Sequence, residues 1–182
     1  MKAPFVVLSL VAALFCTLIA FSTGEDGRLG GHWKLVPEKS GSIDPWNQLG
    51  LDIVTEGSHI TIVKRYDAGN ALDRRVDSMT VNTVGSEEVV SVPPGRWLGE
   101  VSMGVYYGPN TKRRVTARMN DSRNGLQVDT RETLQTAQGA IEVTVKDVYT
   151  LAPDGSSLQL SQTRSTRTSG PPLTYTFARV IQ

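Results

Sequence analysis

The stretch GHWKLVPEKS, Gly31–Ser40, decides the fold. Trp33 and Leu35 are separated by one residue, and this spacing places two side chains on the same face of a β-strand. Pro37 ends the run after too few residues for a helix. Because a solvated loop would leave the large apolar side chain of Trp33 in water, the stretch predicts a short strand with its Trp33 face buried.

The same alternation of apolar and polar residues recurs through the rest of the chain, whereas helical periodicity is nearly absent after residue 31. Turn residues such as Pro153-Asp154-Gly155 interrupt it. The alternating runs include Leu49–Ile53, Ile60–Tyr66, Val115–Met119, Ile141–Leu151 and Tyr175–Arg179. This pattern predicts about eight to ten short antiparallel strands, in a sandwich or an up-and-down barrel.

A closed barrel is favoured over a sandwich. Each strand is apolar on one side only, and rolling the sheet into a tube buries that side and removes the exposed edges. We therefore predict an all-β, antiparallel, up-and-down β-barrel. The segment Gly85–Gly99 breaks the pattern, and Pro93-Pro94 cannot lie in a central strand. We interpret it as a long loop over one barrel end, with Trp97, Tyr106 and Tyr107 as its anchors or as core residues.

The N-terminus has the order of an export signal. Met1 and Lys2 precede the uncharged run Ala3–Phe21, and small residues follow up to Gly24. We predict a signal helix in residues 1–24 with cleavage near Gly24, a short linker at 25–30 and one barrel domain at 31–182. The protein would then be periplasmic or secreted. The run is also long enough for the alternative of an uncleaved membrane anchor.

Charge, cysteine and histidine content narrow the function further. The net charge is +1, and Lys2 is the only charged residue before Glu25, so the remaining chain is neutral. This argues against nucleic acid or an anionic membrane as a partner.

Cys16 is the only cysteine, so the domain has no disulfide. His32 and His59 are out of phase with their apolar neighbours, and no glycine-rich phosphate loop occurs, so we predict no metal and no cofactor.

Motifs at both ends of the domain resemble lipocalins and the wider calycin superfamily. In that superfamily a Trp in a G-x-W on the first strand lies across the closed barrel end, and an Arg on the last strand packs over it. Here these positions are Gly31, Trp33 and Arg179. The chain is also similar to exported bacterial lipocalin-like domains of unassigned function. That similarity rests on Gly31, Trp33, Lys34, Leu35, Lys39, Ser40, Tyr149, Leu151, Asp154, Gly155, Leu158, Phe177 and Arg179.

Charged residues on the apolar faces mark a candidate site. Counting by twos from Ile141 reaches Asp147 and Tyr149, and counting from Leu126 reaches Glu132. From Leu158 the same count reaches Gln162 and Arg164. Matching the apolar faces across the turn at 153–155 places Asp147 opposite Gln162 or Leu160, with Arg164 one or two pairs away. A carboxylate inside a barrel must be paired, hydrated or protonated.

These inward residues allow several interpretations. Asp147 and Arg164 could form an internal ion pair, or a bulge could turn one of them outward. Alternatively, Glu132, Asp147, Tyr149, Gln162 and Arg164 line a partly wet cavity that binds a small polar or amphipathic molecule without catalysis. Two other functions stay open. One is a filled barrel that interacts with another envelope protein, and the other is an isomerase- or cyclase-type enzyme that uses an interior carboxylate as general base.

Overall fold

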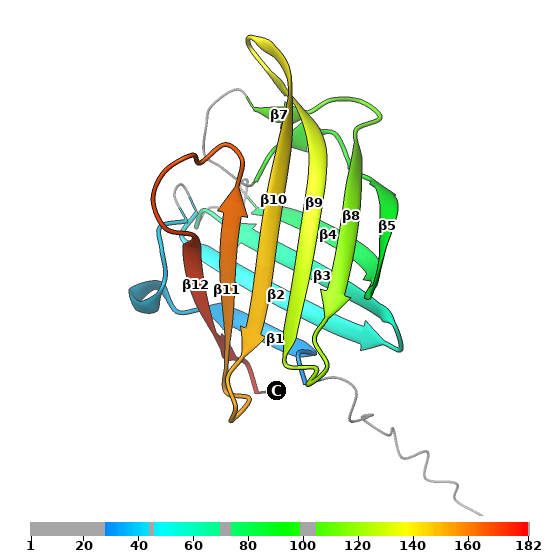
Figure 1. The fold of residues 1–182 in the computed structure, drawn as a ribbon. Helices are drawn as coiled ribbons and strands as arrows, with labels where there is room; N and C mark the ends of the chain where they lie inside the picture. The colour runs from blue at the N-terminus through cyan, green and yellow to red at the C-terminus, as the bar shows by residue number, and fades with distance from the viewer. Residues whose placement is uncertain (1–27, 44–45, 70–73, 99–104, 182) are drawn as a thin grey trace, which may run out of the picture.

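Twelve antiparallel strands joined in one sheet make up the computed structural model, which describes residues 28–43, 46–69, 74–98 and 105–181 (Figure 1). The predicted all-β antiparallel class is confirmed. The strands are β1 Gly31–Leu35, β2 Gln48–Glu56, β3 His59–Asp67, β4 Arg74–Asn82, β5 Val84–Ser91, β6 Gly95–Arg96, β7 Tyr106–Tyr107, β8 Lys112–Met119, β9 Gly125–Thr136, β10 Gly139–Leu151, β11 Ser157–Arg164 and β12 Leu173–Arg179.

Helical structure in the described ranges is limited to one 3-10 turn, η1, Pro37–Lys39. Within these ranges, no helix has the length and apolar character that a membrane span requires. The predicted signal segment, residues 1–24, lies outside the described residues, as do residues 25–27 of the predicted linker.

The sheet is a meander that closes into a nearly complete barrel. Consecutive strands pair from β1 to β4 and from β8 to β12, and β1 pairs with β12. In the described residues no backbone ladder joins β4 to β5 or β8, and side chains bridge this seam instead. Arg113 on β8 donates to Asp77 on β4 over 3.1 Å, and the backbone of Asn82 donates to Glu88 on β5 over 3.0 Å.

The segment Gly85–Gly99 is more regular than the sequence predicts, which is one reason the strand count is twelve. The prediction of a long loop there is wrong for the described part, because all of β5 except Val84, and all of β6, lie in this segment. Gly99 lies outside the described residues. A register shift between Val84 and Glu87 and the positive φ of Gly85, 85°, disturb the alternation at the start of β5. Trp97 and Tyr107 are buried in a small core cluster, whereas Tyr106 is exposed.

One end of the barrel is sealed by an arginine stacked on a tryptophan. The guanidinium carbon of Arg179 lies 4.2 Å from the centroid of the Trp33 ring, and Trp33 is 2 % exposed. The indole Nε1 donates to the carbonyl of Leu29, whose side chain is also buried. Arg179 in turn donates to the carbonyls of Gly30 and Gly155. A cation over an indole, shielded from water by these neighbours, contributes about 1–2 kcal/mol.

The glycine of the G-x-W motif is required by this seal. A Cβ at Gly31 would meet the Nη1 atom of Arg179 at 2.7 Å, and Gly31 has a φ of +138°, which other residues rarely adopt. Gly31 therefore lets the guanidinium reach the ring.

We expect Gly31→Ala to lower the free energy of unfolding by about 2 kcal/mol, through backbone strain and displacement of Arg179. Gly50→Ala, in which the new Cβ makes ordinary contacts at 3.8 Å or more, is the matched control and should be neutral or slightly stabilising. Urea unfolding followed by circular dichroism measures both. Equal losses in the two variants would contradict the role given to Gly31.

Candidate functional site

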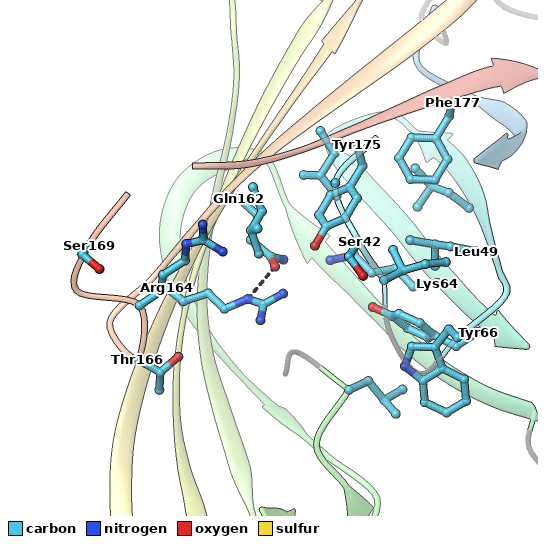
Figure 2. A pocket seen from close by; sticks show the side chains of 18 of the residues that line it. Ser42, Leu49, Lys64, Tyr66, Gln162, Arg164, Thr166, Ser169, Tyr175 and Phe177 are labelled. Atoms are coloured by element: carbon cyan, nitrogen blue, oxygen red, sulfur yellow. Dashed lines mark hydrogen bonds between the residues drawn. The ribbon is translucent and has the colours of Figure 1, made fainter. Parts of the chain in front are cut away.

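A cavity of about 850 Å³ lies at the barrel end opposite the Trp33 seal. Strands β2, β3, β11 and β12 form its walls, and the segments around Ile43 and Thr168 border it (Figure 2). Its apolar lining includes Ile43, Trp46, Leu49, Leu51, Leu160 and Phe177. Its polar lining includes Lys64, Tyr66, Gln162, Arg164, Arg167 and Tyr175. The cavity therefore offers both a large apolar surface and a group of polar side chains.

A chain of hydrogen bonds around Asp147, here called the Asp147 cluster, connects the buried interior to this cavity. Lys64 donates to Asp147 Oδ2 over 2.5 Å, and Gln162 Nε2 donates to Oδ1 over 2.7 Å. The Tyr149 hydroxyl lies 3.5 Å from Oδ2. Arg164 Nε donates to Gln162 Oε1 over 2.6 Å. Gln162 thereby links the buried ion pair to the guanidinium of Arg164.

A second network, the Glu132 cluster, fills the interior between β4, β8 and β9. Trp97 Nε1 donates to Glu132 Oε1 over 2.6 Å, and Arg113 Nε donates to Oε2 over 2.8 Å. Arg113 also donates to the Tyr107 hydroxyl over 2.8 Å and to Asp77. A narrow space of about 40 Å³ separates this cluster from the Asp147 cluster. The interior charges therefore form one polar layer across the barrel.

Burial and neighbouring charges shift the pKa values of several side chains in and beside this layer. Burial is the largest single effect and would lower the pKa of Lys64, but the Asp147 carboxylate, Tyr149, Tyr66 and Asp77 together outweigh it and hold this pKa well above its usual value. Burial raises the pKa of Tyr66 to about 12 against the opposing effect of Lys64. Burial likewise raises the pKa of Tyr175, while Arg164 opposes the shift. Lys64 is therefore charged and both tyrosines are neutral at physiological pH.

The sequence-predicted site residues all point inward, but they divide between the two networks. Gln162 and Arg164 line the cavity, Asp147 lies behind them, and Tyr149 is fully buried beside it. Glu132 belongs to the other cluster. Asp147 pairs with Gln162 in the sheet register, one of the two predicted pairings. The proposed ion pair between Asp147 and Arg164 is wrong, because the cation that contacts Asp147 is Lys64 on β3.

Three inward charged residues were missed by the sequence analysis: Lys64, Asp77 and Arg113. The same count by twos finds them. Lys64 follows Ile60 and Ile62 in phase, Asp77 precedes Met79 and Val81 in phase, and Arg113 precedes Val115 in phase. Arg113 is directly opposite Glu132 on the neighbouring strand β9. The pairs Lys64–Asp147 and Arg113–Asp77 join strands distant in the sequence, so only the closed barrel shows them. His32 and His59 are exposed as expected, and His32 lies 2.8 Å from Asp52 on the outer face.

Comparison with known proteins adds no assignment. A scan against protein-family models and a search of curated proteins both found no match to the chain.

The pairing of Lys64 with Asp147 predicts strongly non-additive substitutions. Lys64→Met leaves a buried carboxylate without its ammonium, and Asp147→Asn leaves the ammonium without its carboxylate. Each should cost about 3–5 kcal/mol of unfolding free energy. The double variant removes both charges and keeps an amide beside Gln162, so it should be more stable than either single variant. A double-mutant cycle in urea tests this, and a double-variant cost equal to the sum of the two single costs would contradict the pairing.

Alkaline pH should destabilise the fold through the same layer. The unfolded chain releases the Tyr66 proton near pH 10.0 and the Lys64 proton near pH 10.5, whereas the folded state retains both to higher pH. From neutral pH to about pH 10 these two groups leave the free energy of unfolding unchanged, and above pH 10 it should fall, with the Tyr66 contribution lost by about pH 12. Tyr66→Phe should make this fall less steep when urea midpoints are measured across the range. An unchanged slope in Tyr66→Phe would contradict the burial of the Tyr66 hydroxyl.

Proposed function

We propose that this protein is an exported, lipocalin-like barrel of the calycin type that binds one small amphipathic molecule in the cavity without catalysis. The observation that carries the proposal is the cavity itself. Its volume of about 850 Å³ lies within the range of small-molecule sites, and its walls combine apolar surface with a few polar groups. A barrel filled by its own side chains, the main alternative, would not leave such a space.

The sealed end supports the calycin part of the proposal. The resemblance of the motifs implies an arginine on the last strand stacked over a tryptophan on the first. The strand pairing Trp33↔Arg179 and the ring contact of Arg179 have this geometry. The export part of the proposal rests on the order of residues 1–24 alone.

The hydrogen bonding of the interior carboxylates favours binding over catalysis. Glu132 accepts from Trp97 and Arg113, and Asp147 accepts from Lys64 and Gln162, so both carboxylates are held by fixed donors. Neither residue lines the large cavity. A general base needs an oxygen within reach of a substrate proton. Fixed carboxylates behind the cavity wall instead position the side chains that face a ligand.

Blocking the cavity tests the proposal. The uncharged fluorescent probe N-phenyl-1-naphthylamine should bind the wild-type protein with increased emission. Leu160→Trp, on the cavity wall, should abolish this binding because the larger ring occupies the space. Gln159→Trp is the matched control, since residue 159 is the exposed neighbour on the same strand, and it should bind normally.

Circular dichroism and thermal unfolding would verify that both variants are folded. Absence of probe binding by the wild-type protein, or unchanged binding by a folded Leu160→Trp variant, would refute the proposed cavity function.

A further inference from the structure

The cations inside the barrel are not equally neutralised. Lys64 is paired with Asp147, and Arg113 contacts two carboxylates, Glu132 and Asp77. Arg164 is different, because no carboxylate in the described part of the chain lies within ion-pair distance of it. The interior charges therefore balance in total but are separated. Arg113 has two carboxylates beside it, one more than its own charge neutralises, and the second of these, Asp77, is partly exposed to solvent. Arg164, at the cavity wall, has none among the described residues.

The guanidinium of Arg164 is held in place from one side only. Its Nε donates to Gln162, and Gln162 is fixed by its own bond to Asp147. In the ranges that the structure describes, its two terminal nitrogens donate to no protein acceptor. The guanidinium carbon of Arg164 lies 5.9 Å from the centroid of the Trp97 ring, a contact that restrains the group further. An arginine anchored through Nε with both terminal nitrogens available has the geometry that carboxylates and phosphates bind.

The rest of the cavity lining has the same charge preference. Lys64 and Arg167 also line it, while no described lining residue is acidic. Tyr175 contributes a neutral hydroxyl whose raised pKa keeps it a hydrogen-bond donor. Figure 2 shows Arg164 and Gln162 on one side of the space and Lys64, Tyr66 and Leu49 on the other. The apolar residues Leu49, Leu160 and Phe177 line the same cavity as Arg164.

We infer that the ligand is an amphipathic anion whose carboxylate head group binds Arg164. Its apolar part lies along Leu49, Leu160 and Phe177. This inference rests on the proposed binding function and specifies its ligand class. Arg164 is then the residue that determines specificity, and Gln162 positions it. The anion supplies the negative charge that Arg164 lacks, so binding completes the pairing of the interior cations.

Three ligands with the same alkyl chain test the charge preference: decanoate, decanol and decylamine. Binding is followed by isothermal titration calorimetry at neutral pH and by tryptophan fluorescence, since Trp46 lines the cavity and Trp97 lies beside Arg164. Decanoate should bind roughly ten- to a hundredfold more tightly than decanol, because hydrogen bonds to a charged group discriminate by about this factor. Decylamine should bind most weakly.

The outcomes separate the inference from the proposed function. If N-phenyl-1-naphthylamine binds but decanoate does not bind or has no advantage over decanol, the inference is overturned while the cavity function stands. If neither the probe nor any alkyl ligand binds, both fail together.

Variants then assign the preference to one residue. Arg164→Gln should reduce decanoate affinity to about that of decanol. Lys146→Gln is the matched control, because it removes one positive charge from the outer face of β10 and should keep the full preference. Arg164→Lys, which keeps the charge but loses the planar fork, should retain part of it. Full preference in a folded Arg164→Gln would overturn the assignment, and if that variant does not fold, an unchanged preference in Arg164→Lys would do the same.

Discussion

The structure depends on the pairing of the first strand with the last. Once β1 lies beside β12, Arg179 is directly opposite Trp33, and the stacked pair seals one end of the tube with the help of Leu29. Pairing of the chain ends closes many residues into one loop, so this contact has a high entropic cost that burial of the surrounding core must offset. Because the stacked pair seals one end, the cavity lies at the other end, which is bordered by the segment between β11 and β12.

The polar layer between the two ends explains how a barrel without a disulfide tolerates charge in its interior. Each buried carboxylate meets a cation and neutral donors, and in the described residues no buried polar side-chain atom is without a hydrogen-bond partner. Such a layer is no more stable than well-packed apolar residues would be. In the proposed function this layer has a role, because its hydrogen bonds position Gln162 and Arg164 at the cavity.

The sequence predicted what depends on local spacing and failed where contacts are distant. Alternation correctly gave antiparallel strands and the inward direction of Asp147 and Glu132, and it limited the strand partner of Asp147 to Gln162 or Leu160, of which Gln162 is the one observed. It misread Gly85–Gly99, because a bulge shifts the phase there. The ion pair between Asp147 and Arg164, one of the alternatives that the sequence left open, is not formed, because Asp147 pairs with Lys64. Lys64 is 83 residues away in sequence and reaches Asp147 across the barrel, a contact set by sheet closure that no spacing along one strand reveals.

The most direct measurement of the central claim, a hollow barrel end with an unneutralised arginine, is a crystal structure of the protein grown with decanoate. We expect electron density for one alkyl chain between β2 and β11, with its carboxylate within hydrogen-bond distance of the terminal nitrogens of Arg164. An interior filled by the protein's own side chains, or a bound chain whose carboxylate points to solvent away from Arg164, would contradict the claim.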